Sequence, residues 1–303
     1  MKWFQTVTLG LSMLIATGCA STADKQQWFY PPMAVPLQAS MQQEVQIARL
    51  SQLLLRSNLS DELRAKMLYE RGNYYDSVGL RDLARLDYGQ SLKLNPAQSD
   101  LFNLLGVYYT QVGEFDAAYE AFDSTLDLDP SHSYAVRNRA IALYYGDRIE
   151  LSLEDIEVHV AEDPNDPFRA LWRYLIKLEQ NPELARQDLL KLYQKRDNQW
   201  GWVLVALSLG EVSEEQTFKA IFAGTRDNTV LAQRLTEAYF YLGKRYQYEG
   251  DFASAISMYK LAISFNVFEY VEHRYSFLEL SRIFNQVKAE QLAKAKLEQA
   301  KQQ

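Results

Sequence analysis

Small, apolar and aromatic residues recur along this chain with one fixed period. Pro96, Pro130 and Pro164 lie 34 residues apart, and each closes a segment with the same arrangement of residue types. Apolar positions three and four residues apart predict a helix in each half of the segment. The proline then ends the second helix and turns the chain. The pattern therefore predicts a helical pair written at least three times.

The residue types within each copy agree with one consensus. They are Leu68, Gly72, Tyr75, Ala84, Tyr88 and Pro96 in the first copy, and Phe102, Leu105, Gly106, Tyr109, Ala118, Phe122 and Pro130 in the second. The third copy has Val136, Ala140, Leu143, Ile156 and Pro164, but Ser152 replaces the alanine. Ordinary amphipathic helices would not restore all these types together at one period, so the segments resemble tetratricopeptide repeats.

A fourth copy of the pattern follows after a gap. It consists of Tyr239, Leu242, Gly243, Tyr246, Ala255, Tyr259 and Ala262, with Val267 in place of the closing proline. The glycines and alanines are small enough to let two helices approach closely while aromatic rings fill the space around them. Because the proline is missing, we expect the stack to change direction after this copy.

The whole pattern predicts an all-α fold, a tetratricopeptide-repeat solenoid with additional non-consensus helices. Alternating runs of valine, isoleucine and threonine, which would indicate strands, do not occur. The expected parts are N-terminal capping helices at 40–64, three repeats at 65–164, degenerate repeat-like helical pairs at 165–235, a further repeat and its following helix at 236–282, and a charged, solvated and partly disordered tail at 283–303.

The first 18 residues have the features of a secretory signal peptide. Lys2 precedes an apolar run at 7–15, and small residues at 16–18 lead to Cys19. This order resembles the signal of a bacterial lipoprotein, in which the cysteine becomes the lipidated N-terminus. Ala16 stands where leucine is usual in that signal. The alternative is a plain signal peptide with an incidental cysteine.

The resemblance implies that Cys19 carries an N-acyl chain and an S-linked diacylglycerol, which together anchor a protein stably in a membrane. Ala20, rather than aspartate, follows the cysteine, and by the usual sorting rule this implies the outer membrane. Sorting between the two membranes stays open. The segment 19–39 is rich in serine, glutamine and proline, and we expect it to be a lipid-anchored flexible tether.

Charge and composition argue against nucleic acid and against enzymatic chemistry. The net charge is −7, and basic residues are interspersed with acidic ones, so no phosphate-binding stripe is present. The sequence contains no nucleophile elbow, phosphate loop or paired histidine spacing. We therefore expect no catalytic site, no metal and no cofactor.

Glu269 and His273 are the exception to weigh, because four residues separate them and they would share one face of a helix. Such a pair could bind a metal or act as acid and base. A structural ion pair is the simpler interpretation. An enzyme using these two residues remains the third functional class.

In tetratricopeptide repeats the first helix of each pair lines an inner groove. The expected protein-binding residues are Tyr69, Asn73, Asn103, Val107, Thr110, Arg137, Ile141 and Tyr144. Chaperone-type repeats bind a terminal carboxylate through a lysine in this groove, but Tyr69 takes that place here. A second set, Trp172, Trp200 and Trp202, lies between the repeat blocks as possible interface anchors. The alternative is that these tryptophans fill the core.

Several segments, in this order, resemble the NlpI lipoprotein family over nearly the whole chain. They are 34–38, 115–122, 142–146, 165–172, 199–202 and 271–275, together with the repeats and the cysteine of the signal. A tail rich in lysine and glutamine, where an acidic end would be expected, is a departure from that family.

The resemblance implies a homodimeric adaptor in the outer membrane. Such an adaptor brings a tail-specific periplasmic protease, Prc, to a murein endopeptidase and so limits cleavage of the cell wall during growth and division. It is also implied to scaffold several peptidoglycan hydrolases. An alternative with the same anchor and repeats is a pilotin-like lipoprotein that assists assembly of a secretin or pilus.

Overall fold

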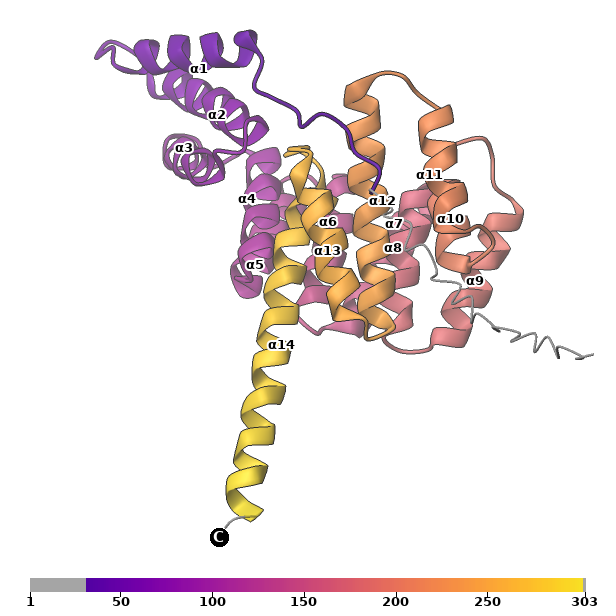
Figure 1. Cartoon of the computed structure of the whole chain (residues 1–303). Coiled ribbons are helices and arrows are strands. Elements are labelled where there is room, and N and C mark those ends of the chain that lie inside the picture. Colours follow the sequence, from indigo (N-terminus) through magenta and orange to yellow (C-terminus); the bar gives the residue numbers. More distant parts are fainter. Residues whose placement is uncertain (1–30, 302–303) are drawn as a thin grey trace, which may run out of the picture. The chain divides into compact units, whose positions relative to one another are not determined.

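The computed structural model describes residues 31–301, which form fourteen α-helices and contain no β-strand. Met33 and the residues after it form one unit by their contacts. The helices, shown in Figure 1, are α1 (Met41–Leu54), α2 (Asp61–Ser77), α3 (Arg81–Leu94), α4 (Ser99–Val112), α5 (Phe115–Leu128), α6 (Ser133–Tyr145), α7 (Ile149–Glu162), α8 (Pro167–Leu178), α9 (Pro182–Gln194), α10 (Trp202–Leu209), α11 (Glu214–Ala223), α12 (Asn228–Tyr248), α13 (Phe252–Ser264) and α14 (Val271–Lys301).

Successive helices pack in pairs. The pairs are α2 with α3, α4 with α5, α6 with α7, α8 with α9, α10 with α11, and α12 with α13. The first three pairs are the three predicted repeats, and α12 with α13 is the fourth. Helix α1 packs on α2. The segment 40–64, where we expected several capping helices, holds α1 and only the first residues of α2. The fold is therefore an all-α tetratricopeptide-repeat solenoid.

Close packing inside the first two pairs follows from the residue types of the consensus. A Cβ atom added to Gly72 would lie 2.5 Å from the ring of Tyr88, and one added to Gly106 would lie 2.5 Å from the ring of Phe122. Each glycine stands on the first helix and each ring on the second. Because a side chain at the glycine would collide with the ring, the small residue sets the distance between the helices.

The fourth pair repeats this contact, and the third pair replaces it. A Cβ atom on Gly243 would lie 2.6 Å from the ring of Tyr259. In the third pair, Ala140 and Ile156 occupy the equivalent places and are fully buried. Ser152, the departure from the consensus, donates a hydrogen bond of 2.7 Å from its hydroxyl to the backbone oxygen of Ala140. The buried hydroxyl is thus satisfied, and the looser copy still packs.

The last helix differs from the expectation of a partly disordered tail at 283–303. Helix α14 runs without a break from Val271 to Lys301. Tyr275, Ser276 and Glu279 in its first half are fully buried, whereas the residues after Ile283 are mostly exposed. Alanine, lysine, glutamate and glutamine dominate the exposed half. These residues favour helix intrinsically, so the helix continues where it has no core to pack on.

The end of the predicted tether is bound to the body of the protein. The backbone N–H and C=O of Val35 both form hydrogen bonds of 2.9 Å with the side-chain amide of Asn228. The backbone N–H of Leu37 donates to the backbone oxygen of Phe265 at 2.9 Å. The tether expected at 19–39 therefore ends before these residues. Cys19 and the predicted signal peptide lie outside the described residues.

A membrane-spanning segment was also sought within the part of the chain that the structure describes. None of the helices there combines the length and the apolar character needed to cross a bilayer.

Candidate protein-interaction site

Four of the eight predicted groove residues are buried. Val107 is 6% exposed, Tyr144 is 4% exposed, and Thr110 and Ile141 are not exposed at all. The other four, Tyr69, Asn73, Asn103 and Arg137, are half-buried. The prediction that all eight line an open groove is therefore wrong for the buried four.

Val107 is buried against residues of α5 and α6. Helix α14 covers others of these residues, because it packs along the first helices of the pairs. Tyr275 lies 5.3 Å from the ring of Tyr145 on α6 and 6.1 Å from the ring of Trp172 on α8, measured between ring centroids. The guanidinium of Arg282 lies 5.8 Å from the ring centroid of Tyr144. Helix α14 also contacts α4 and α12. The groove that we expected to hold a partner is thus largely filled by the chain's own last helix.

Charged side chains hold the first turn of α14 against the first repeat. Arg274 pairs with Asp76 on α2, with 2.5 Å between Nη2 and Oδ2. Arg81, the first residue of α3, donates from Nη2 to Nδ1 of His273 at 2.8 Å. Arg274 and His273 are both buried. We call this row of contacts between α14 and the first helices the α14 seam.

The predicted pair of Glu269 and His273 does not form. Helix α14 begins only at Val271, so Glu269 lies before the helix and is exposed, whereas His273 is buried. Burial and the positive charges of Arg81 and Arg274 lower the pKa of His273 to about 3. The side chain is therefore a neutral hydrogen-bond acceptor. Among the described residues, no group of histidine, cysteine, aspartate and glutamate could hold a metal ion.

One open cavity remains at the α8 end of the seam. It has a volume of about 320 Å³ and lies between α6, α7, α8, α12 and the first turn of α14. We call it the groove cavity. Its lining includes Tyr134, Arg137, His159, Asp166, Phe168, Arg169, Trp172, Glu237, Glu269, Tyr270 and Glu272. Arg137, a predicted groove residue, and Trp172, a predicted interface residue, thus meet here.

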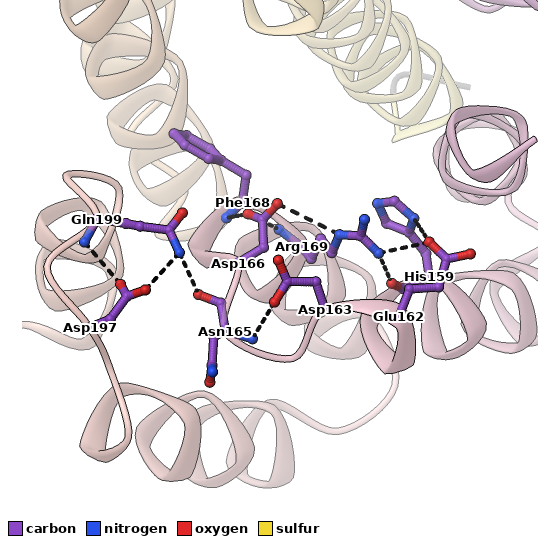
Figure 2. A network of polar contacts seen from close by, with 9 residues as sticks. All are labelled: His159, Glu162, Asp163, Asn165, Asp166, Phe168, Arg169, Asp197 and Gln199. Atoms are coloured by element: carbon purple, nitrogen blue, oxygen red, sulfur yellow. Dashed lines mark hydrogen bonds and ion pairs between the residues drawn. The ribbon is translucent and has the colours of Figure 1, made fainter.

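A polar network fixes the wall of the groove cavity formed by α7 and α8 (Figure 2). Asp166 caps α8 by accepting hydrogen bonds from the backbone N–H of Phe168 at 2.7 Å and of Arg169 at 3.3 Å. Pro167 at the first helical position favours this start. The guanidinium of Arg169 then reaches back to the backbone oxygen of His159 and, at 3.0 Å, to Glu162. This wall is therefore set by the sequence around 166–169.

The network leaves one buried polar atom without a hydrogen bond. His159 is 2% exposed, and its Nδ1 lies 3.7 Å from Oε2 of Glu162, too far for a hydrogen bond. Burial and the neighbouring Arg169 and Arg137 lower the pKa of His159 to about 3. A neutral imidazole at the cavity wall can accept or donate one hydrogen bond to a bound group.

Two buried carboxylates form the acidic part of the groove cavity. Glu237 is 7% exposed and Glu272 is 5% exposed. Burial and the nearby Glu272 carboxylate hold the pKa of Glu237 well above that of an ordinary glutamate. Burial also raises the pKa of Glu272, which accepts a hydrogen bond of 3.2 Å from the hydroxyl of Tyr241. The cavity therefore favours a bound cation, which would relieve the repulsion between the two carboxylates.

The rim of the groove cavity is aromatic and basic. Tyr134 is 61% exposed, and the guanidinium of Arg137 lies 5.1 Å from its ring centroid. Arg137 is further held by hydrogen bonds of 3.1 and 3.0 Å to the side chain of Asn138. An exposed tyrosine stacked on a fixed arginine is a common anchor in protein interfaces.

The structure separates the three predicted interface tryptophans. Trp172 is 2% exposed and Trp202 is 3% exposed, so both belong to the core, and their assignment as exposed anchors is wrong. Trp200 is half-buried, and the guanidinium of Arg234 lies 5.2 Å from its ring centroid. The core interpretation holds for these two residues because other helices pack against α8, which carries Trp172, and against α10, which carries Trp202.

Sequence reasoning missed Glu237, Glu272 and the role of α14. Carboxylates at helical spacing normally lie on the solvent side, and the pattern of α14 gives no apolar stripe that would indicate a buried face. The sequence indicates a buried face of α14 only through two apolar residues, Tyr275 and Leu278, which lie among charged ones in this segment.

Comparisons with known proteins find solved structures of low sequence identity to this chain. No family model matches the chain. A tetratricopeptide-repeat protein from Parabacteroides merdae is 14% identical, with 71% of this chain and 78% of that chain covered and a TM-score of 0.48. PilF of Pseudomonas aeruginosa is 18% identical, with 73% and 100% covered and a TM-score of 0.43.

A third solved structure is PilW, described as a widely conserved type IV pilus biogenesis factor. It is 15% identical, with 79% of this chain and 100% of that chain covered and a TM-score of 0.41. Likeness at this level carries no conclusion about function. The assignment of the repeats rests on the 34-residue period and on the glycine-to-ring contacts within the pairs. The fold is thus an all-α solenoid built from tetratricopeptide-type helical pairs.

Proposed function

We propose that this chain is a lipid-anchored periplasmic adaptor, without catalytic activity of its own, that binds partner proteins at the groove cavity. The observation that carries the proposal is this cavity of about 320 Å³, which stays open beside the first turn of α14. It combines an exposed aromatic rim with buried charge on a fixed helical frame. Such surroundings suit binding of a side chain from a partner.

The charge of the groove cavity indicates which side chain it binds. Asp166 and Arg169 lie 3.6 Å apart and offset each other. Glu237, Glu269 and Glu272 then face the single guanidinium of Arg137 among the lining residues. Burial and mutual repulsion disfavour the charged forms of Glu237 and Glu272, and a positive side chain would stabilise them. The preferred anchor is therefore a lysine or arginine of the partner, seated beside the ring of Tyr134.

The anchor of the proposal is Cys19, whose lipid chains would hold the protein at the outer membrane, facing the periplasm. The support for this step is the order of residues in the signal. Val35 is held to the body by its backbone hydrogen bonds. The 16 residue steps from Cys19 to Val35 can reach at most about 58 Å when fully extended. The adaptor would therefore act close to the membrane surface.

The proposed partners are a tail-specific, Prc-like protease and murein endopeptidases, with a second copy of the chain forming a homodimer. An adaptor that holds protease and substrate together raises their effective concentration, often by a factor of about 100 or more. Turnover of the endopeptidase would then limit cleavage of peptidoglycan during growth and division. The resemblance to the NlpI lipoprotein family motivates this choice of partners.

The proposal is tested with three purified proteins: the protease, the endopeptidase and this chain. We expect the chain to accelerate degradation of the endopeptidase at least about tenfold. Tyr134→Ala should weaken binding to a partner about tenfold, because it removes the rim anchor. Phe222→Ala is the matched control, since Phe222 is a 44% exposed ring on α11, away from the groove cavity.

Degradation that does not change when the chain is added would contradict the adaptor role. Equal binding by Tyr134→Ala and Phe222→Ala would instead move the contact away from the groove cavity. A deletion strain that loses pili but turns over its cell wall normally would favour the pilotin-like alternative.

A further inference from the structure

A second cavity of about 250 Å³ lies farther along α14, between α6, α8, α10, α12, α13 and α14. Four tyrosines line it, Tyr144, Tyr174, Tyr241 and Tyr248, and we call it the tyrosine cavity. Leucine and phenylalanine side chains complete its apolar wall. An apolar cavity of about 150 Å³ already holds a benzene molecule. The tyrosine cavity can therefore hold an apolar side chain together with a small polar group.

One of the three cations that line this cavity, Lys244, is already paired inside the protein. The Nζ atom of Lys244 donates to the hydroxyl of Tyr144 at 2.8 Å and to Oε1 of Glu279 at 2.5 Å. The other oxygen of Glu279 accepts from Gln247 at 3.0 Å. Burial opposes the charge on Lys244, but Glu279 and Tyr144 outweigh it and raise the pKa of Lys244. An ammonium group has three protons, so one remains for a bound group.

A second cation, Arg282, has no such partner. Its guanidinium forms no hydrogen bond or ion pair with any residue that the structure describes, and its Nη1 atom is buried. It packs over aromatic rings, 5.8 Å from the centroid of Tyr144 and 5.2 Å from that of Tyr145. A guanidinium is a rigid fork that binds a planar carboxylate through two parallel hydrogen bonds. Arg282 is among the residues that line the tyrosine cavity.

The charges around the tyrosine cavity balance within the protein. Lys244, Arg245 and Arg282 are offset by Glu279, Glu214 and Glu179, and the carboxylate of Glu279 attracts both Lys244 and Arg282. What the guanidinium of Arg282 lacks is a hydrogen-bond acceptor. A planar carboxylate can supply that acceptor.

We propose that the tyrosine cavity binds the C-terminal carboxylate of a peptide whose last side chain is apolar. The carboxylate would lie on the fork of Arg282 and the free proton of Lys244, and the side chain among the tyrosine rings. The site is separate from the groove cavity, which has different lining residues. It goes beyond the adaptor role, and its test requires neither the protease nor the endopeptidase.

The test is calorimetric titration of the purified chain with acetyl-Ala-Phe as the free acid and as the C-terminal amide. We expect the acid to bind at least about tenfold more tightly than the amide, because charge-assisted hydrogen bonds to arginine are lost in the amide. Arg282→Gln should weaken binding of the acid by the same factor and leave binding of the amide unchanged. Arg226→Gln, at an exposed arginine outside the cavity, is the matched control and should have no effect.

A second variant separates loss of the site from loss of the fold. Ser208 lines the tyrosine cavity from α10 and carries no charge. Ser208→Phe should fill the space and prevent binding of the acid while the charges stay in place. The proposal is overturned if acid and amide bind equally, if the acid fails to bind at millimolar concentration, or if a folded Arg282→Gln protein binds the acid as the wild type does.

Discussion

The helical pairs and the α14 seam are stabilised by different chemistry. In the pairs, a glycine on one helix faces an aromatic ring on the next, as Gly106 faces Phe122. In the seam, buried charges carry the contacts, as in the pairing of Lys244 with Glu279. Apolar packing tolerates small changes of shape, whereas a buried charge that loses its partner is very costly. The seam should therefore be the more sensitive of the two regions.

The largest expected effect comes from breaking the buried ion pair of the seam. Glu279→Ala leaves the ammonium of Lys244 buried without its counterion, and we expect it to lower the free energy of unfolding by about 3–5 kcal/mol. Glu290→Ala, on the exposed half of the same helix, should change it by less than about 0.5 kcal/mol. Urea denaturation measures both values. Equal stability of the two variants would contradict a buried pair at this place.

A smaller effect is expected inside the helical pairs. Gly106→Ala places a methyl group 2.5 Å from the ring of Phe122, which is fully buried and cannot move away freely. We expect a loss of about 1–3 kcal/mol in the free energy of unfolding. Gly89→Ala is the matched control within α3, because nothing lies within 4 Å of the added methyl. That control should stabilise the protein by about 0.5–1 kcal/mol.

The seam should also contribute to the pH dependence of stability through His273. The pKa of His273 is about 3 in the folded protein and 6.5 in the unfolded chain. Below pH 6.5 the unfolded chain takes up a proton that the folded protein does not, so stability falls as pH decreases toward 3. The slope from this histidine approaches about 1.4 kcal/mol per pH unit.

His273→Asn keeps an acceptor for Arg81 but cannot take up the proton. Its free energy of unfolding should therefore fall less steeply between pH 6 and pH 4 than that of the wild type, in thermal or urea denaturation. Parallel curves for the two proteins would show that His273 is protonated equally in both states.

The smallest effect is expected from the exposed half of α14. Removal of the chain after Glu290 deletes a segment whose described side chains are all exposed. The free energy of unfolding should change by less than about 0.5 kcal/mol, because helix alone contributes little at this length. A larger loss would mean that the end of α14 packs against something, such as a second copy of the chain.

The sequence predicted the pairs because their packing is periodic. Gly72 and Tyr88 recur at fixed spacing with their equivalents, and a repeated contact leaves a repeated pattern. The seam occurs once, so no period marks it. Its charged residues, such as Glu272 and Arg274, have the composition of a solvated helix and become buried only through contacts with distant helices.

The candidate site was predicted in part for the same reason. Arg137 was found from its place in the repeat, and it does line the groove cavity. Glu237 lies on the fourth repeat, and only the tertiary fold brings it into the same cavity as Arg137. Ile141 was misplaced because a repeat consensus describes an open groove and says nothing about a helix that fills it. Val107 was misplaced because it packs against α5 and α6.

Hydrogen exchange along α14 tests the central claim that its first half fills the groove. The account predicts that the amides of Tyr275, Leu278 and Ile283 exchange as slowly as those of α4 and α6, while the amides after Glu290 exchange rapidly. Uniformly rapid exchange along the whole of α14, with α4 and α6 still protected, would contradict it.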